Sequence, residues 1–432
     1  MSGCSSWRSG SWRPECTGDI LALASYPTFD PNAPPVSYAD VVDRQNHATA
    51  VPFEPGSVFK IITLSAALET TRLRPETLID CGRGPLTLFG RSIHEAHTYY
   101  GTISMADVLK HSSNIGAIRI GLTVGQSNLY QYVKKFGFGD KIGIPLPGES
   151  RGRLRPLKQW LATSAASISM GQEVSVTTLQ LARAVSVIAN GGLLVQPRLV
   201  LKKGDRLVPI EPPARIIKAE TAITMRQMME GVVMPYGTGY PEGRVAGYSV
   251  AGKTGSAQIF DFATKHYTHN YNGSFVGMVP ITNPSMVVVV TLNGTHGNNG
   301  YGGRAAAPVF HAVATEALRL LEVPKDLPDE LPPTLVAQKA AEPDDDVAQA
   351  DFSIAPNILL DPEDDDEAPA AAAATGPKVP DFAGKTMRDV LAEAASKGLT
   401  ILPNGSGVAR VQYPAAGATL RQGERIRVQF SR

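Results

Sequence analysis

The chain has 432 residues, of which 43% are hydrophobic and 19% are charged, as in folded proteins long enough for more than one domain. Its formal net charge of +1 gives no reason to expect a nucleic-acid partner. The cysteines Cys4, Cys16 and Cys81 have neither metal-binding spacing nor a disulfide pattern, so no metal and no cofactor are expected. The sequence contains no apolar run of about 20 residues and no basic-then-apolar start, which predicts neither a membrane helix nor a signal peptide.

The small net charge hides an uneven distribution along the chain. Between Lys339 and Lys378 there are eleven acidic residues and no basic ones, and residues 378–432 carry nine basic against four acidic residues. This leaves +7 for residues 1–339. A basic body of this size suits an anionic polymer as partner, but it is also compatible with an ordinary protein surface.

The predicted elements begin after an unassigned segment, residues 1–16, which shows no periodicity. The turn Thr17-Gly18-Asp19 precedes a predicted strand over 20–24, and no convincing partner strand lies before it, so a shortened start is expected. Helical spacing of apolar residues predicts helices over 57–70, 104–120, 178–189 and 305–321. Apolar runs predict strands over 248–251, 273–278 and 286–293.

Residues 323–377 contain two acidic runs and an Ala/Pro tract, which cannot bury a core and therefore predict a disordered linker. Beyond it, a helix over 387–397 and a strand over 426–430 predict a small second domain at 378–432. The first domain is then expected at 17–322.

The first motif with chemical potential is Ser57-Val58-Phe59-Lys60, which opens the helix predicted after Pro55-Gly56. Its spacing puts Ser57 and Lys60 on one helical face. A serine hydroxyl is a poor nucleophile at neutral pH, and a lysine in a dry cleft can accept its proton. Alone, the pattern is weak, because a chain of this length contains it by chance.

The second motif, Ser112-Ser113-Asn114, interrupts the apolar pattern of the helix predicted over 104–120. Serine and asparagine are unfavourable inside a helix unless their side chains have partners. Ser112 could relay a proton between Lys60 and a leaving amine, and Asn114 could bind a peptide backbone. The alternative is a break in the helix whose polar groups satisfy one another.

The third motif, Lys253-Thr254-Gly255-Ser256, follows the strand predicted over 248–251. Strand alternation puts Lys253 and Gly255 on one face, and the glycine lets another backbone approach. The ammonium group of Lys253 and the hydroxyls of Thr254 and Ser256 suit a substrate carboxylate. No upstream glycine has the spacing of a phosphate-binding loop.

Together the motifs supply a nucleophile, a base, a proton relay and a carboxylate receptor. The backbone N–H groups of Ser57 and Ser256 are candidates for an oxyanion hole. This set suits acyl transfer through a serine ester from a peptide with a free carboxylate. Two other candidates are dismissed: Ile93-His94-Glu95-Ala96-His97 is interpreted as a loop without a third metal ligand, and Cys81 as a packed thiol.

The motifs resemble those of class B penicillin-binding proteins, especially the cell-division and sporulation-type transpeptidases. Further matching stretches are residues 17–22, 30–32, 54–57, 170–177, 237–239 and 247–253. The resemblance implies an α/β (α+β) fold, with a five-stranded, mainly antiparallel sheet flanked by helices and a helical subdomain carrying Ser112 and Asn114. Residues 378–432 resemble a PASTA domain, a small α+β module that binds peptidoglycan fragments or packs on the transpeptidase. The marks of that resemblance are Val379, Pro380, Asp381, Phe382, Gly384, Leu391, Gly398, Leu399, Val411, Gln412, Pro414, Gly417 and Gly423.

The resemblance implies a serine-type peptidoglycan D,D-transpeptidase of cell division, with carboxypeptidase activity as a side reaction. Ser57, deprotonated by Lys60, would attack the D-Ala-D-Ala amide of a stem peptide, and β-lactams would acylate the same serine. Ser112 and Lys60 would pass the proton to the departing D-Ala. Asn114 would orient the stem, and the residues binding its carboxylate would be Lys253, Thr254, Gly255 and Ser256.

The family also implies the extracytoplasmic face of the inner membrane and divisome partners, including a glycosyltransferase. Its members usually carry a cytoplasmic tail, a membrane helix and a pedestal domain before the Thr-Gly-Asp turn. Two alternatives stay open. A β-lactamase or β-lactam sensor shares the three motifs, although no glutamate in an E-x-x-x-N pattern stands between Ser112 and Lys253. A non-catalytic peptidoglycan-binding protein would use the small domain alone.

Overall fold

The computed structural model describes residues 2–3, 17–96, 98–261, 266–328, 378–397, 399, 401–405, 407–413, 416–417 and 426–431. The chain divides into two compact units, Met1–Ala355 and Pro356–Arg432, which are treated separately below. Most of the predicted linker, from residue 329 to 377, lies outside the described residues. So do residues 4–16 of the unassigned start.

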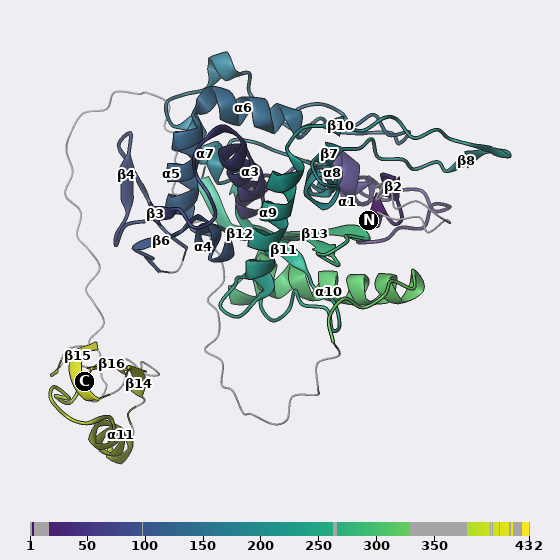
Figure 1. Ribbon diagram of the computed structural model, residues 1–432. Helices are drawn as coiled ribbons and strands as arrows, with labels where there is room; N and C mark the ends of the chain where they lie inside the picture. The colour runs from purple at the N-terminus through teal and green to yellow at the C-terminus, as the bar shows by residue number, and fades with distance from the viewer. Residues whose placement is uncertain are drawn as a thin grey trace. The chain divides into compact units, whose positions relative to one another are not determined.

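The first unit is built on a five-stranded antiparallel sheet, as predicted (Figure 1). The strand order is β11-β12-β13-β1-β2. The strands are β11 (Ala251–Asp261), β12 (His266–Val279), β13 (Met286–His296), β1 (Ser2–Gly3) and β2 (Asp19–Ile20). Strand β11 therefore lies at one edge of the sheet, where one side of its backbone has no neighbouring strand of that sheet.

Two predictions about these strands are wrong. Strand β11 starts at Ala251 and contains the Lys253 motif, whereas the motif was expected after a strand over 248–251. The strand expected over 20–24 is limited to β2, and its partner, expected to be missing, is β1, in which Ser2 pairs with Ile20. A two-residue strand is too short to leave a period-two pattern.

Helices cover both faces of the sheet (Figure 1). Helix α10 (Gly302–Leu320) packs on one face, where Phe310 lies against Phe275 of β12 with ring centroids 4.7 Å apart. Helices α8 (Thr178–Ala189) and α9 (Ala219–Glu230) pack on the other. The bounds of α8 match the prediction, because Thr177 and Gln180 form a capping box that fixes its start.

Several of the remaining helices form a second layer beyond α9. Helix α3 (Lys60–Thr70) lies between α9 and α5 (Asn114–Val124), and most of its side chains are buried. The other helices are α1 (Tyr38–Asp43), α2 (His47–Ala50), α4 (Met105–Lys110), α6 (Gln126–Lys135) and α7 (Ser164–Ser169), with 3₁₀ turns η1 (Gly56–Phe59), η2 (Leu157–Gln159), η3 (Gly231–Val233) and η4 (Asn298–Gly300). Within the described chain, no helix combines the length and apolar character needed to cross a bilayer.

Short two-stranded ribbons complete the unit. They pair β3 (Leu78–Asp80) with β6 (Thr102–Ser104), β4 (Leu86–Leu88) with β5 (Arg91–Ile93), β7 (Leu193–Leu194) with β10 (Ala214–Arg215), and β8 (Lys202–Lys203) with β9 (Arg206–Leu207).

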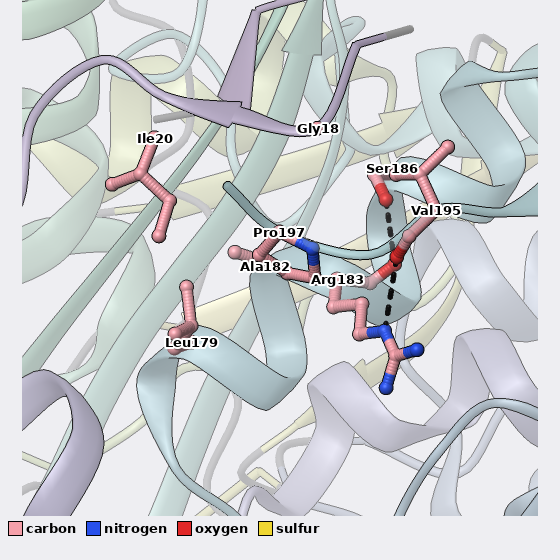
Figure 2. A pocket seen from close by; sticks show the side chains of 8 residues that line it. All are labelled: Gly18, Ile20, Leu179, Ala182, Arg183, Ser186, Val195 and Pro197. Atoms are coloured by element: carbon pink, nitrogen blue, oxygen red, sulfur yellow. Dashed lines mark hydrogen bonds between the residues drawn. The ribbon is translucent and has the colours of Figure 1, made fainter. Parts of the chain in front are cut away.

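The start of the described chain is anchored beside α8, around a small pocket (Figure 2). The backbone of Ile20 donates to the carbonyl of Arg198 at 2.9 Å, and the Arg198 guanidinium pairs with Asp19. Across the pocket, Arg183 Nε donates to the carbonyl of Val195 at 3.0 Å. None of the three motifs contributes a residue to this pocket, which therefore serves the packing of β2 rather than the predicted chemistry.

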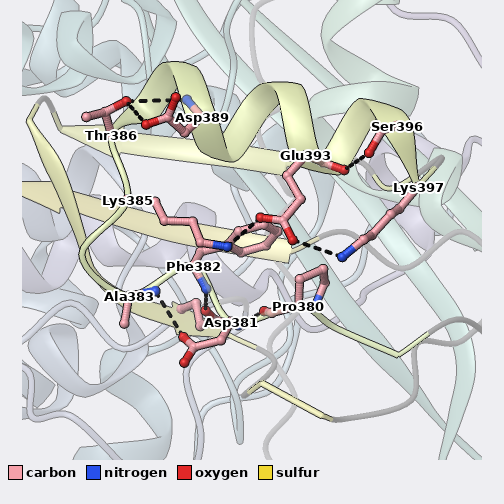
Figure 3. A network of polar contacts seen from close by, with 11 residues as sticks. Pro380, Asp381, Phe382, Ala383, Lys385, Thr386, Asp389, Glu393, Ser396 and Lys397 are labelled. Atoms are coloured by element: carbon pink, nitrogen blue, oxygen red, sulfur yellow. Dashed lines mark hydrogen bonds and ion pairs between the residues drawn. The ribbon is translucent and has the colours of Figure 1, made fainter.

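The second unit is a small α+β domain. Helix α11 (Met387–Ser396) precedes β14 (Ile401–Gly405), β15 (Val408–Tyr413) and β16 (Ile426–Ser431). Strand β16 lies in the middle, parallel to β14 and antiparallel to β15. The unit has its own apolar cluster, which includes Phe382, Val390 and Phe430. On its surface the carboxylate of Glu393 accepts from two lysines (Figure 3). The distances are 2.6 Å to Lys385 Nζ and 2.9 Å to Lys397 Nζ. Three expected marks, Gly398, Pro414 and Gly423, lie outside the described residues.

The turn η1 is seated on the loop that follows α7. The N–H of Gly56 donates to the carbonyl of Gly171 at 3.1 Å. Gly171 has φ +85°, and a Cβ atom there would lie 2.1 Å from the Gly56 carbonyl oxygen. Any side chain at residue 171 would therefore push η1 away from this loop.

We expect Gly171→Ala to lower the free energy of unfolding by more than Gly90→Ala. Gly90 has φ +76° with no atom within 4 Å of its Cβ position, so its variant loses about 1 kcal/mol for the left-handed backbone alone. Gly171→Ala adds an overlap that costs roughly 1–3 kcal/mol. Thermal and denaturant unfolding of both variants would test this, and equal losses would contradict the close approach.

Candidate active site

Ser57 lies in the 3₁₀ turn η1, which runs directly into α3 at Lys60. The sequence predicted an α-helix from residue 57, and this is wrong for its first turn. In a 3₁₀ turn, side chains three residues apart are eclipsed, so Ser57 and Lys60 share one side more closely than on an α-helix. Both are buried, with 3% and 0% of their surface exposed.

The second motif lies between two helices and not within one. The helix predicted over 104–120 is divided into α4 and α5, because Ser112 adopts φ 59°, a left-handed conformation that is uncommon outside glycine. Ser113 caps α5, since its Oγ accepts from the N–H of Gly116 at 2.9 Å. The break turns both the carbonyl and the hydroxyl of Ser112 toward Lys60, whose Nζ donates to each of them.

The hydroxyl of Ser112 joins the three motifs. Lys60 Nζ donates to Ser112 Oγ at 3.1 Å and to Asn114 Oδ1 at 2.9 Å, and Lys253 Nζ donates to the same Ser112 Oγ at 2.7 Å. Both lysines are completely buried. A hydroxyl has two acceptor sites and one hydrogen, so Ser112 can accept from both ammonium groups and still donate to a third. This arrangement is able to pass a proton between groups on opposite sides of Ser112.

The residues of the third motif lie along the edge strand β11. Lys253 and Gly255 face η1, and a Cβ at Gly255 would lie 2.9 Å from Val58 Cγ1 and 3.1 Å from the Pro55 carbonyl oxygen. The predicted close approach at Gly255 is therefore confirmed. Ser256 faces α10 instead, where its Oγ accepts from the N–H of Gly302 at 3.0 Å.

The two hydroxyls of this motif are held in different ways. Thr254 Oγ1 lies 2.7 Å from Thr238 Oγ1 and accepts from Lys253 Nζ at 3.4 Å. Since Ser256 Oγ accepts from the N–H of Gly302, the hydrogen of its own hydroxyl can be donated to a ligand. This strip of β11, Lys253 to Ser256, combines a buried cation with two hydroxyls, a composition that suits a carboxylate.

Sequence reasoning missed one residue of this site, Glu95. It lies in the loop after β5, as predicted for residues 93–97, but its carboxylate contacts the second motif. Glu95 Oε2 accepts from the N–H of Asn114 at 2.6 Å, and Oε1 accepts from Ser113 Oγ and from the N–H of Ile115 at 3.3 Å. These bonds span 18 to 20 residues, so no local pattern could reveal them.

The other dismissed candidates can also be placed. Cys81 is completely buried and contacts the carbonyl of Ile79, which confirms a packed thiol. His97 lies outside the described residues. Across the described part of the chain, no group of three or more His, Cys, Asp or Glu side chains could hold a metal ion.

Comparison with known proteins agrees with this geometry. The family model "Penicillin binding protein transpeptidase domain" matches residues 15–315, and the model "PASTA domain" matches residues 377–432. The chain belongs to the penicillin-binding protein transpeptidase family. The fold is thus that of a penicillin-binding transpeptidase domain, followed by a PASTA domain.

Members of the family from several bacteria are similar over the same region. Penicillin-binding protein PbpB of Mycolicibacterium smegmatis is 35% identical over 73% of this chain and 50% of its own, and stage V sporulation protein D of Bacillus subtilis is 36% identical over 71% and 48%. The chain thus spans about half the length of these relatives. The crystal structure of penicillin-binding protein 3 from Mycobacterium tuberculosis, complexed with ampicillin, has a TM-score of 0.63 and 34% identity, covering 71% of this chain and 70% of that chain.

In this transpeptidase domain a second carboxyl group, that of Glu54, stands just before the turn η1. Glu54 Oε1 accepts from the N–H of Glu173 at 3.0 Å, and Oε2 accepts from Tyr267 OH at 3.2 Å. Burial raises the pKa of Glu54 to about 7, although both of these hydrogen bonds favour its ionised form. Glu54 thereby links η1 to the loop after α7 and to β12.

We expect this carboxyl to make stability depend on pH. Because its folded-state pKa of about 7 lies above its ordinary value of 4.5, the folded protein binds the proton more tightly than the unfolded chain. The stabilisation is fully present below pH 4.5 and is lost as the pH rises through 7. The melting temperature of the wild type should therefore fall, relative to that of Glu54→Gln, between pH 5 and pH 8.

The matched control is Glu76→Gln, which removes an exposed carboxyl. Its melting temperature should follow that of the wild type across the same pH range. If the curves of the wild type and Glu54→Gln run parallel, Glu54 does not titrate in this window.

Proposed function

We propose that this chain is a serine peptidoglycan D,D-transpeptidase that works through an acyl-enzyme on Ser57. The observation that carries the proposal is the Ser112 hydroxyl, which accepts from the buried lysines of two other motifs, Lys60 and Lys253. A structural packing role does not require two buried cations to converge on one hydroxyl, because each costs several kcal/mol to desolvate. A proton relay through Ser112 gives this convergence a reason, because it puts the hydroxyl within hydrogen-bond distance of Lys60.

The acylation step follows from these contacts. In the resting site Lys60 Nζ donates three hydrogen bonds as an ammonium group, so it first loses one proton to solvent. The neutral amine then takes the proton of Ser57, whose Oγ attacks the carbonyl carbon between the two D-alanines of a stem peptide. The C–N bond then breaks, and the departing D-Ala nitrogen receives the proton from Lys60 by way of Ser112. Lys60 returns to the neutral amine, and the peptide remains as an ester of Ser57.

The substrate carboxylate would bind the strip on β11. Lys253 supplies the positive charge, and the hydroxyls of Thr254 and Ser256 supply hydrogen bonds. Because β11 is an edge strand, an extended stem peptide can add to it through main-chain hydrogen bonds. Gly255 keeps this edge close to η1.

Two further groups act on the peptide. Asn114 Oδ1 accepts from Lys60, and its Nδ2 donates to the carbonyl of His94 at 3.3 Å, which leaves a second N–H hydrogen for the stem backbone. The N–H groups of Ser57 and Ser256 would form the oxyanion hole, where one donor is worth about 3 kcal/mol in the transition state.

The amine of a neighbouring stem would attack the ester, forming a 4→3 cross-link and releasing Ser57. β-Lactams would acylate Ser57 in place of the stem, as the ampicillin complex of the Mycobacterium tuberculosis relative suggests. From the resemblance of the motifs to cell-division and sporulation-type transpeptidases, and the similarity to stage V sporulation protein D, we propose a role in septal wall synthesis at the extracytoplasmic face of the inner membrane. Divisome proteins, including a glycosyltransferase, are the proposed partners, and the PASTA domain would contact peptidoglycan or the transpeptidase.

The proposal predicts a stable adduct after incubation with penicillin. Intact-protein and peptide mass spectrometry should find one penicilloyl group on the peptide that contains Ser57. Ser57→Ala should give no adduct, because it removes the hydroxyl that Lys60 is proposed to deprotonate. Ser65→Ala, which removes another buried serine of α3, should label like the wild type.

Three results would contradict the proposal. Labelling that persists in Ser57→Ala would remove the assigned nucleophile. Hydrolysed penicillin without an adduct would identify a β-lactamase. A folded protein that neither binds nor hydrolyses penicillin would be a non-catalytic wall-binding protein.

A further inference from the structure

Glu95 is the only acidic residue among the described ones that is buried, with 7% of its surface exposed. The mechanism above gives it no role. It lies beside a site with two completely buried lysines, Lys60 and Lys253. Burying a carboxylate is costly unless it is paired and hydrogen-bonded, so its place needs a reason.

The Glu95 carboxylate caps the N-terminus of α5. Its two oxygens accept from three donors, the hydroxyl of Ser113 and the backbone N–H groups of Asn114 and Ile115. These N–H groups belong to the first turn, which has no partner within the helix. The positive end of the helix dipole favours a negative charge at the same place.

These contacts continue to the reacting groups. The N–H of Asn114 is bound by Glu95, and its side-chain Oδ1 accepts from Lys60 Nζ. Ser113, which donates to Glu95, directly follows Ser112. The Glu95 carboxylate therefore holds the backbone that directly follows Ser112, whose hydroxyl lies between the two lysines.

Charge favours the same role. Burial is the largest effect and leaves the pKa of Glu95 raised, while the hydrogen bond from Ser113 and the positive charge of Lys60 offset part of that rise. Lys60 thus interacts favourably with the ionised carboxylate across the Asn114 peptide. Removing the negative charge would leave the cations of the site without an acidic neighbour buried as deeply.

We propose that Glu95 is a positioning residue for acylation, and this inference rests on the proposed function. Its carboxylate fixes the peptide units of Ser113 and Asn114. This keeps the Ser112 hydroxyl and the Asn114 side-chain amide within hydrogen-bond distance of Lys60 Nζ. Its charge offsets part of the positive charge of Lys60. Glu95 acts through these residues and does not touch the substrate.

Glu95→Gln separates this role from simple space filling. The glutamine amide keeps the shape of the side chain but has one oxygen where the carboxylate has two. Its NH₂ group would therefore face at least one of the three donors, Ser113 Oγ and the N–H groups of Asn114 and Ile115. We expect the acylation step of labelling by a fluorescent penicillin to slow about 100-fold, as for a displaced catalytic group. The dissociation constant of the initial complex should change little, because the carboxylate strip on β11 is untouched.

Two controls make the outcome specific. Glu95→Asp keeps the charge and should recover at least about ten-fold of the loss in Glu95→Gln, since ionic hydrogen bonds tolerate a small shift better than loss of an acceptor. Gly90→Ala, in the turn between β4 and β5, lowers stability without touching Glu95. At a temperature where circular dichroism finds all variants folded, it should label like the wild type.

Wild-type labelling is the reference for the whole series. If the wild type is not labelled, the proposed function fails, whatever the variants do. If the wild type is labelled and Glu95→Gln reacts at the same rate, or Glu95→Asp is as slow as Glu95→Gln, the inference about Glu95 is overturned while the function stands.

Discussion

The structure depends on one hydroxyl group that accepts hydrogen bonds from two buried ammonium groups. Lys60 comes from a helix, Lys253 from an edge strand, and Ser112 from the break between two other helices. Removing a lysine from water is costly unless its hydrogens find acceptors. The three elements must therefore be held at fixed distances, and much of the surrounding packing serves this requirement.

Glycines make that packing tight. Gly171 admits the carbonyl of Gly56, Gly255 admits the backbone of η1, and Gly302 lets the start of α10 approach the carbonyl of Gly255, where a Cβ would be 2.3 Å away. Each removes a side chain where two backbones meet. The turn η1 is thereby held between a loop and the edge of the sheet, so Ser57 has little freedom to move away from Lys60.

The features that the sequence predicted are those with a local cause. A capping box fixes the start of α8. Strand alternation put Gly255 on the same face as Lys253, and a glycine there predicted the close approach of another backbone. What it could not predict depends on contacts between distant segments. The left-handed backbone at Ser112 is stabilised by the hydrogen bond that Lys60 Nζ donates to its carbonyl, and Glu95 finds its partners 18 to 20 residues away. The partner strand β1 has two residues, too few for a pattern.

The most direct test is a crystal structure of the protein after reaction with a penicillin. The account predicts an ester bond at Ser57 Oγ, the antibiotic carboxylate within hydrogen-bond distance of Thr254 Oγ1 or Ser256 Oγ, and Ser112 Oγ still between Lys60 and Lys253. An adduct on another residue would contradict it. So would an ester at Ser57 with the carboxylate turned away from β11 and the two lysines separated from Ser112.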